Sequence, residues 1–327
     1  MTKIGFLGDP HAKIQSLPEV EKIIDFSIKS FADCKYFVIL GDLFDTHAVV
    51  RLEIQAFWQA QIDKILSKWK DSPEKKLIVL EGNHDRPHAA HLQNLSALKT
   101  LKGDFVLVSN TYTIPEISMG FVGYHHHEDD FVEAALNAYD IGGQRFLVCH
   151  QTFNGAVYDN GMYAPDGFDA EKLSQAVVIS GHIHTAHSFG KVVYPGTSRW
   201  ESKSDANKDK GIWILTVEEN LSWTSELIST EGVVPKMYEI EWHEGEPQPN
   251  LLEGNKYVVK MVGSSSWISK NRVKILDKAK ITPVYTDTIQ NRVDRKKNYV
   301  SIESFVDETF SDESVKKEAL IEYLRKL

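Results

Sequence analysis

The sequence has only two cysteines, and they lie far apart. Cys34 and Cys149 form no C-x-x-C pattern. Small folds that depend on disulfides need a denser and more regular set of cysteines. The sequence therefore argues against a disulfide framework and favours a reducing compartment.

Long apolar runs and low-complexity tracts are also missing. No run approaches the ~20 apolar residues that a membrane-spanning helix requires. The first residues, MTKIGFLGDP, turn polar too early for a secretory signal. We therefore expect a cytoplasmic protein with no membrane partner.

What the sequence does contain is typical of a globular protein with an uneven charge. The chain has 327 residues, enough for one large domain and a small one, and its net charge is −9. Residues 251–300 nevertheless carry eleven Lys and Arg against four Asp and Glu, a local balance of +7. Such a segment is either a binding face for phosphate or an ordinary solvated surface.

Short apolar runs alternate with helical patterns in the first part of the chain, which predicts a layered α/β fold. Strands are predicted at 4–7, 36–40, 77–80, 146–149 and 177–180, helices at 18–31, 49–70 and 88–101, and β-rich pieces at 105–108, 120–123, 188–193, 212–217 and 222–228.

The pattern changes near residue 235 and predicts a second, smaller module. Strands are predicted at 238–242, 257–262 and 282–287, with a helix at 267–280 and a last helix at 312–327. We therefore divide the chain into a large domain at 1–230, a small α+β domain at 235–308 and a C-terminal helix at 309–327.

Polar side chains follow five of the predicted buried strands. The motifs are GDPH, GDLFD, EGNHD, a histidine after RFLVC, and GHIH. Ligands of α/β folds bind outside the carboxyl ends of the strands, so we expect these groups to converge. The candidate metal ligands are Asp9, His11, Asp42, Asn83, His150, His182 and His184.

Seven ligands of this kind are too many for one open tetrahedral ion. Carboxylates, imidazoles and an amide oxygen, with no thiolate, suit Mn²⁺, Fe²⁺ or Zn²⁺. Two ions that share a carboxylate can stabilise an in-line displacement at phosphorus. The D-x-H and H-x-H spacings place both ligands on one side if the backbone is extended.

Glycines precede the proposed ligands at four of the strand ends. They are Gly8, Gly41, Gly82 and Gly181. Glycine is favoured where the backbone turns sharply or approaches another group closely. We therefore expect each of these positions to be crowded or to have an unusual backbone conformation.

The five motifs resemble those of the calcineurin-like metallophosphoesterases. GDLFDTH, LEGNHDRP and the segment VVYPGTSRWESKSDANKDKGIWIL are similar to one branch, the SbcD-type DNA repair nucleases of bacteria and phages. The resemblance covers residues 3–230 well and 235–300 in architecture only. It implies a four-layer α/β/β/α sandwich followed by a small α+β capping domain.

The resemblance also implies roles for individual residues. Asp9, His11 and His184 would hold one metal, Asn83, His150 and His182 the other, and Asp42 would bridge them. His84 would face the scissile phosphate and assist the leaving oxygen. Since a catalytic imidazole needs a partner that fixes its tautomer, we expect Asp85 to hydrogen-bond to His84. Two Mn²⁺ ions are expected, with Mg²⁺, Fe²⁺ or Zn²⁺ as alternatives.

Two histidine positions stay open. Some members of the family have a histidine where this chain has Asp45, and His47 either substitutes for it or is a solvated loop residue. The run His125-His126-His127 either contacts nucleic acid and tunes the site or is a solvated loop. The last helix either docks on a partner or folds back on its own domain.

Three functions are compatible with these residues. The first is a Mn²⁺-dependent nuclease, a 3′–5′ exonuclease on duplex ends and an endonuclease on single strands or hairpins. By resemblance it would be a homodimer that works with an SbcC-type coiled-coil ATPase, in the host cytoplasm if phage-encoded. Its candidate DNA contacts, with Trp267 beside them, are Lys270, Arg272, Lys274, Arg292, Arg295, Lys296 and Lys297.

The other two functions make no use of the basic segment. The second is a phosphatase or phosphodiesterase for a small substrate such as a nucleotide. The third is a non-catalytic scaffold with a decayed site. The complete ligand set argues against decay, because a lost activity should leave gaps among the ligands.

Overall fold

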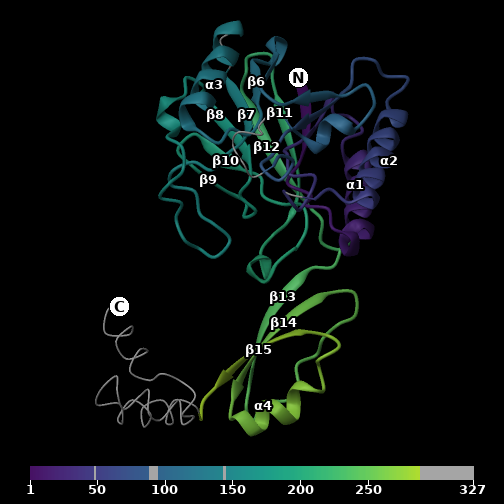
Figure 1. Cartoon of the computed structure of the whole chain (residues 1–327), viewed down its shortest axis with the longest axis vertical. Helices are drawn as coiled ribbons and strands as arrows, with labels where there is room; N and C mark the ends of the chain where they lie inside the picture. The colour runs from purple at the N-terminus through teal and green to yellow at the C-terminus, as the bar shows by residue number, and fades with distance from the viewer. Residues whose placement is uncertain (48, 88–94, 143–144, 288–327) are drawn as a thin grey trace, which may run out of the picture. The chain divides into compact units, whose positions relative to one another are not determined.

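The computed structural model describes residues 1–47, 49–87, 95–142 and 145–287, and the chain divides into two compact units (Figure 1). The first unit is Met1–Tyr238 and the second is Glu239–Leu327. Among the described residues, no helix is both long and apolar enough to cross a membrane.

The first sheet has six strands in the order β12-β11-β1-β2-β3-β4. Its parallel part consists of β1 (Thr2–Leu7), β2 (Tyr36–Ile39), β3 (Lys76–Leu80) and β4 (Val106–Val108). On the other side of β1 lie β11 (Gly211–Val217) and β12 (Trp223–Ser229), both antiparallel to their neighbours.

The second sheet also has six strands, in the order β5-β6-β7-β8-β10-β9. The parallel strands are β6 (Met119–Val122), β7 (Phe146–His150), β8 (Val177–Gly181) and β10 (Val192–Tyr194). Antiparallel strands β5 (Thr111–Ile114) and β9 (His187–Phe189) form its two edges.

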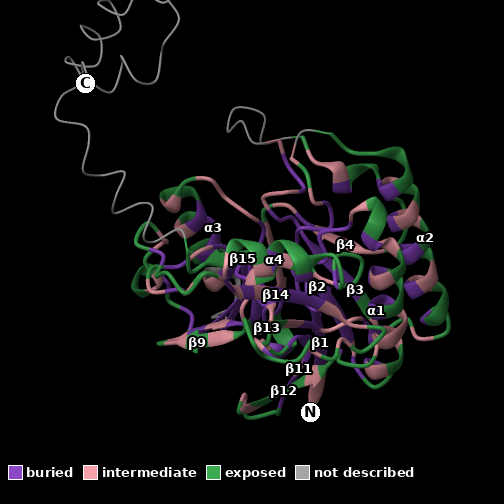
Figure 2. Cartoon of the chain, turned by 90° about the horizontal axis from the view of Figure 1, so that it is seen from below, coloured by how far each residue is buried: buried purple, intermediate pink, exposed green. Residues whose placement is uncertain are grey.

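Alternate residues of the two sheets meet in one hydrophobic core. Ile4 and Phe6 of the first sheet belong to the same buried cluster as Phe121 and Val148 of the second. This alternation follows from the two-residue period of a strand, which sends neighbouring side chains to opposite faces. Figure 2 shows the inner strands of the first unit as mostly buried.

Helices cover the outer faces of both sheets. Helices α1 (Leu17–Ser30) and α2 (Leu52–Lys68) lie side by side, and Phe31, just after α1, packs on Phe37 of β2 with ring centroids 4.9 Å apart. Helix α3 (Glu128–Gly142) packs on the second sheet. The layers are therefore α/β/β/α, and the predicted fold class is confirmed.

Helix α1 begins and ends where its sequence predicts. Pro18 occupies the first turn, Glu19 follows it, and Lys29 lies in the last turn, as the helix dipole prefers. Short 3-10 helices occur at Ile14–Ser16, Ala97–Thr100, Pro115–Ile117, Ala170–Lys172 and Lys203–Asp205. Of the helix predicted at 88–101, residues 88–94 lie outside the described residues.

Helix α3 was not predicted from the sequence. Its buried face consists of Phe131 and three alanines, Ala134, Ala135 and Ala138. Alanine gives a weak apolar stripe because its side chain is small, although its helix propensity is the highest of all residues. The three acidic residues Glu128, Asp129 and Asp130 stabilise the positive start of the helix.

The second unit contains a three-stranded sheet in the order β13-β14-β15. Strands β14 (Lys256–Gly263) and β15 (Lys280–Tyr285) are parallel and joined by α4 (Ser265–Arg272), while β13 (Met237–His243) begins at the boundary between the units. The predicted helix at 267–280 is too long. It ends at Arg272, since Val273 and Leu276 are exposed and offer no apolar face for another turn.

Both cysteines are free, and both are buried. Burial raises the pKa of Cys34 to about 11 and the pKa of Cys149 to about 12. The predicted C-terminal helix and the residues Arg292, Arg295, Lys296 and Lys297 lie outside the described residues.

Candidate metal centre

The predicted ligands come from both sheets. Loops after β1, β2 and β3 supply four of them, and the ends of β7 and β8 supply the other three. Parallel strands point the same way, so their carboxyl ends share one edge of a sheet. The polar motifs of the two sheets therefore meet at the edge formed by the carboxyl ends of these strands.

The first cluster contains Asp9, His11 and His184, with one donor atom of each within 4.8 Å of the others. The Nε2 atoms of His11 and His184 face each other at 3.0 Å. One oxygen of Asp9, Oδ2, accepts a hydrogen bond from the backbone N–H of His182 at 2.6 Å. These residues are the predicted ligands of one metal ion.

The second cluster contains Asp42, His150 and His182 at the same spacing, with Asn83 between the two rings. Oδ1 of Asn83 lies 3.0 Å from Nε2 of His150 and 2.8 Å from Nδ1 of His182. Oδ2 of Asp42 lies 3.3 Å from Nε2 of His150 and 3.6 Å from Nε2 of His11. Asp42 therefore lies between the two clusters, where a shared ligand is expected.

The donor atoms of both clusters fit divalent cations. Oδ1 of Asp9 is buried and has no hydrogen-bond partner among the described residues. A buried carboxylate oxygen without a partner is costly, and a cation would offset that cost. Imidazole, carboxylate and amide donors without sulfur suit Mn²⁺, Fe²⁺ or Zn²⁺, and the division of the ligands between two ions stays a prediction.

The backbone at the ligands is strained rather than extended. His11, Asp42 and His182 have φ of 40°, 53° and 79°, in the left-handed region. The extended geometry predicted across D-x-H and H-x-H is therefore wrong. A sharp turn at the first or last residue of each motif brings the two side chains together instead, and such strain is common at functional sites.

The glycines before the ligands are crowded, as predicted. A Cβ atom on Gly41, whose φ is 103°, would lie 2.6 Å from Nδ1 of His150. A Cβ atom on Gly82 would lie 2.1 Å from Oδ1 of Asp42. Both positions lack room for any side chain, because the ligands themselves occupy the space.

The carboxylates of the centre differ in their environment. Burial raises the pKa of Asp9 to about 6. Burial would also raise the pKa of Asp42, but His150 and His11 outweigh it and lower that pKa well below its usual range. Burial would lower the pKa of His150, yet Asp42 and Asp9 raise it to about 10. Since bound imidazoles are neutral, a cation at His150 would displace a proton.

His84 is not a predicted ligand, but it forms a third group with His11 and Asp42, whose donor atoms also lie within 4.8 Å of one another. Its Nδ1 donates to the backbone carbonyl of Asp45 at 2.7 Å, and its backbone N–H donates to Oδ1 of Asp42 at 2.9 Å. Its ring centroid is 4.7 Å from that of His11. Because the carbonyl can only accept, Nδ1 carries the hydrogen, and Nε2 is the atom that can act on a substrate.

The predicted hydrogen bond between Asp85 and His84 is wrong. The carboxylate of Asp85 accepts backbone N–H groups of Asp42 at 2.9 Å, Phe44 at 3.2 Å and Gly82 at 2.9 Å. Asp85 thus connects the loops after β2 and β3. The tautomer of His84 is fixed by the Asp45 carbonyl, a backbone atom that residue types do not reveal.

His47 is not a solvated loop residue. Its ring lies 4.0 Å from the ring of His84, centroid to centroid, and its Nδ1 is 2.8 Å from the carbonyl of Asn83. Asp45, at the position of the family's histidine, pairs through its side chain with Lys13 at 2.9 Å. His47 therefore packs against the predicted catalytic imidazole, whatever its role.

The three consecutive histidines lie between β6 and α3. His125 and His126 are half-buried and His127 is exposed, so the run as a whole is not a solvated loop. Burial lowers the pKa of His125 to about 4. The neighbouring Tyr124 stacks toward His182, with ring centroids 6.3 Å apart. This tyrosine, rather than a histidine, connects the run to the metal centre.

Sequence reasoning missed the groups that orient the ligand rings. Nδ1 of His150 lies 2.7 Å from the carbonyl of Leu40, and Nδ1 of His184 lies 3.4 Å from Oδ2 of Asp159. Such contacts fix the tautomer and orientation of metal-binding imidazoles. Asp159 belongs to a long loop and to none of the motifs, so no pattern in the sequence marks it.

The basic residues of the second unit are described only in part. Lys270, Arg272 and Lys274 are exposed at the end of α4 and just after it. Trp267 is half-buried against Trp242, with ring centroids 5.1 Å apart. The tryptophan therefore supports the helix that carries the three cations.

Two matches to known proteins bear on the family of this chain. The family model described as "Calcineurin-like phosphoesterase" matches residues 2–186, and so contains all seven predicted ligands. A protein of Invertebrate iridescent virus 6, described as "Putative phosphoesterase 244L", is 28% identical over 230 residues, 65% of this chain and 75% of its own length. With its two sheets, its five motifs and this match, the chain belongs to the calcineurin-like phosphoesterases, hydrolases that act on phosphoester bonds.

Proposed function

We propose that the chain is a metal-dependent DNA nuclease, the nuclease subunit of an SbcCD-type repair and recombination complex. The observation that carries this proposal is the arrangement of two donor clusters around Asp42, with His84 beside them. The exposed Lys270, Arg272 and Lys274 support a polyanionic substrate, because phosphate contacts supply most of the affinity for nucleic acid.

Each part of the site would have a separate role in hydrolysis of the phosphodiester bond. The two clusters would hold two divalent cations, with Mn²⁺ proposed, which stabilise charge on the phosphate oxygens when bound. With Nδ1 bonded to the Asp45 carbonyl, His84 would have to be doubly protonated to give a proton from Nε2 to the leaving oxygen, and burial, which lowers the pKa of His84, acts against that form. Asp85 would keep the loops after β2 and β3 in register.

The proposal includes three partners. DNA is the substrate, an SbcC-type coiled-coil ATPase would control access to it, and a second copy of the chain would complete a homodimer. Val50, Leu52 and Leu95 support the homodimer, because these large apolar side chains are 40%, 77% and 56% exposed. Gln55 bonds to Thr100 at 2.8 Å, which joins the start of α2 to the segment that follows Leu95.

The second candidate is a phosphoesterase for small substrates such as nucleotides. The viral relative is compatible with it, since its description is that of a phosphoesterase. The same metal centre would serve both reactions, so only the substrate separates them.

The test is digestion of linear duplex DNA labelled at the 3′ or the 5′ end. Wild type would be compared with His84→Ser and Asp42→Ala in Mn²⁺, Mg²⁺ and EDTA. We expect stepwise 3′–5′ degradation in Mn²⁺, none in EDTA, and a loss of at least ~100-fold in His84→Ser, since a general acid contributes about that much. His243→Ser, at an exposed histidine of the second unit, is the matched control.

If the DNA is not digested, three explanations have to be separated: a nuclease that needs its ATPase, an enzyme for small substrates, and a scaffold. If DNA survives while a chromogenic phosphodiester is cleaved, the same digestion is repeated with the ATPase and ATP. Continued survival then rejects the nuclease and favours the small substrate. A chain that binds no Mn²⁺ and cleaves neither compound would instead be a scaffold.

A further inference from the structure

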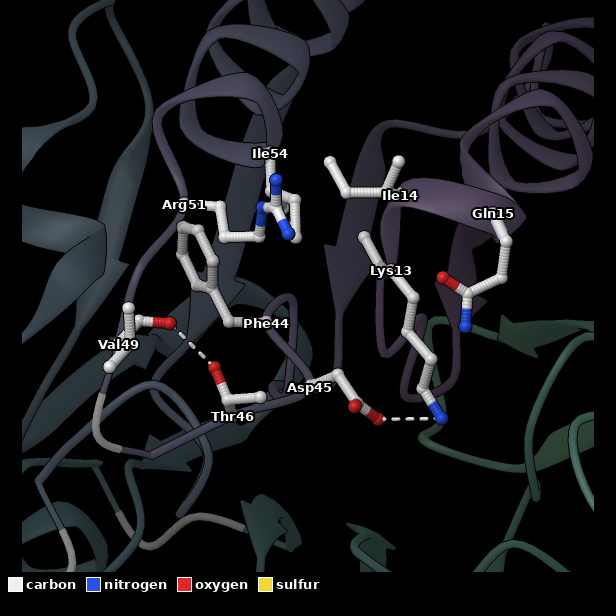
Figure 3. A pocket seen from close by; sticks show the side chains of 10 residues that line it. Lys13, Ile14, Gln15, Phe44, Asp45, Thr46, Val49, Arg51 and Ile54 are labelled. Carbon is white, nitrogen blue, oxygen red and sulfur yellow. Dashed lines mark hydrogen bonds and ion pairs between the residues drawn. The ribbon is translucent and has the colours of Figure 1, made fainter.

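A cavity of about 500 Å³ opens beside the metal centre in the first unit. One wall is the segment after His11, with Lys13 and Ile14, and the other is formed by residues 44–46 and the start of α2 (Figure 3). Backbone pairing between Ala12 and Phe44 joins the two walls. The volume lies within the roughly 300–1,000 Å³ of ordinary ligand pockets.

The inside of the cavity is mainly apolar. Phe44 and Ile54 are almost fully buried, while Ile14 and Val49 keep a third or more of their surface exposed. Ile14 faces Phe44 and Ile54 across the hollow (Figure 3). An exposed isoleucine and an exposed valine at one opening are unfavourable in water, so an apolar ligand group would stabilise them.

Cations lie at the edge of this apolar space. Lys13 pairs with Asp45 at 2.9 Å, and Arg51 pairs with Glu53 at 3.2 Å. The pair of Arg51 is solvent-exposed and the pair of Lys13 is partly exposed. Pairs near the surface contribute little to stability, so a phosphate can compete for the cations. The ligand that matches the cavity therefore has an apolar part and an anionic part.

The cavity also shares a residue with the metal centre. Asp45 lines it, and the carbonyl of the same residue accepts the hydrogen bond from Nδ1 of His84 at 2.7 Å. Ala12 and Lys13 directly follow His11. A group in the cavity would thus adjoin a phosphate held at the metals and His84.

We propose that this cavity binds the base and sugar of the nucleotide next to the scissile phosphate. The inference rests on the proposed nuclease or nucleotide-hydrolysing function, and it deepens both by naming a nucleotide subsite. The apolar walls would contact the base, and Arg51 and Lys13 would contact a flanking phosphate, as arginine and aromatic groups do in single-strand sites.

This subsite has a consequence for the form of DNA that is cut. A base that is stacked and paired in a duplex cannot enter a side cavity, so the nucleotide must first leave the stack. Duplex ends would therefore be cut after fraying, and single-stranded ends would be cut faster.

The experiment measures binding to the Mn²⁺-loaded full chain by calorimetry. The probes are inorganic phosphate, deoxyribose 5-phosphate, and the 3′- and 5′-monophosphates of thymidine and deoxyadenosine. We expect at least one nucleotide to bind about ten-fold more tightly than the sugar phosphate, since about 1.4 kcal/mol from burial of the base against the apolar walls corresponds to that factor. Ile14→Trp, which fills the cavity, should remove this difference and leave the affinity for inorganic phosphate unchanged.

Leu136→Trp, at a partly exposed leucine of α3, is the matched control and should behave as wild type. Equal binding of sugar phosphate and nucleotides by the wild type would overturn the subsite. The subsite would also be overturned if Ile14→Trp still bound nucleotides more tightly than the sugar phosphate, to the same extent as the wild type.

The outcome for the subsite is separate from the outcome for the nuclease. Base-dependent binding without DNA cleavage keeps the subsite and replaces DNA by free nucleotides as the substrate. DNA cleavage without base-dependent binding keeps the nuclease and rejects the subsite.

Discussion

At the scale of single residues, the imidazole rings of the metal centre are oriented by groups outside the set of predicted ligands. The rings of His150, His184 and His84 are each held at Nδ1, by the Leu40 carbonyl, by Asp159 and by the Asp45 carbonyl. Each contact leaves Nε2 to face the centre. Such contacts fix the tautomer and the orientation of the imidazole rings.

Asp159→Asn is the prediction that belongs to this scale. Burial would raise the pKa of Asp159, but hydrogen bonds from His184 and Thr185 lower it overall, so the group is a carboxylate. Replacing it with a neutral amide should weaken Mn²⁺ binding about 10- to 100-fold, as loss of an orienting partner does elsewhere.

Calorimetric titration of Mn²⁺ would measure this effect directly. Asp166→Asn, an exposed residue of the same loop, should bind Mn²⁺ as the wild type does. Unchanged affinity in Asp159→Asn would show that the contact with His184 is not needed for metal binding.

At the scale of elements, the loops are joined by buried polar contacts. Asp85 holds the loops after β2 and β3. Lys210, at the start of β11, donates to the carbonyl of His184 and the hydroxyl of Thr197, both at 2.7 Å, and pairs with Asp205 at 2.5 Å. The loop after β8 is thus tied to the sheet that carries the other half of the centre.

Asp205→Asn should lower the free energy of unfolding at pH 7 by about 3–5 kcal/mol, because Lys210 would then be a buried charge without its counter-charge. Burial would raise the pKa of Asp205, but Lys210 outweighs burial and lowers that pKa overall. A carboxylate whose pKa is lowered by folding stabilises the fold above its unfolded pKa of about 3.9. This contribution is lost as the pH falls below that value.

Urea denaturation at pH 7 and at pH 3.5 would test both statements. The difference in the free energy of unfolding between wild type and Asp205→Asn should be largest at pH 7 and smaller at pH 3.5. The exposed Asp209→Asn is the control for the loss of one negative charge. A difference that grows toward low pH would reverse the sign and contradict the ion-pair explanation.

At the scale of the whole molecule, charge is divided between an acidic body and a basic segment. The net charge of −9 gives no general attraction for DNA. If the second unit binds DNA, replacing Lys270, Arg272 and Lys274 by Gln should weaken binding. It should also reduce the slope of log K against log salt by about 2–3, since each phosphate contact contributes about 0.9.

Fluorescence anisotropy of labelled DNA from low to moderate salt would give that slope. The control replaces three exposed lysines of the first unit, Lys22, Lys68 and Lys70, by Gln, which removes the same charge. If both triple variants lost the same amount of DNA affinity and of salt dependence, the effect would come from general electrostatic attraction and not from a specific binding face.

The proposed homodimer gives a second prediction at this scale. Leu52→Glu should convert a dimer into a monomer, because a charge in the centre of an apolar interface lacks a partner. Light scattering after size-exclusion chromatography would give the mass, with the exposed Leu276→Glu as control. A wild-type mass near 37.1 kDa would already reject the homodimer.

The sequence by itself determined most of the strands, although it missed β5, and it determined the ligand types and the crowded turns. Each of these depends on neighbouring residues, such as an apolar run that ends in a glycine and a carboxylate or imidazole. Helix α3 was missed because its buried face is mostly alanine, and helix α4 was predicted too long because helical spacing continues past its last supported turn.

Only the tertiary structure decided how the ligands are held. The two sheets contribute to one centre through loops with left-handed turns, and this geometry depends on contacts between segments far apart in the chain. The partners of His84, His150 and His184 are two backbone carbonyls and an aspartate outside every motif. The cavity beside the centre likewise exists only because two loops pair at Ala12 and Phe44, which no local pattern can encode.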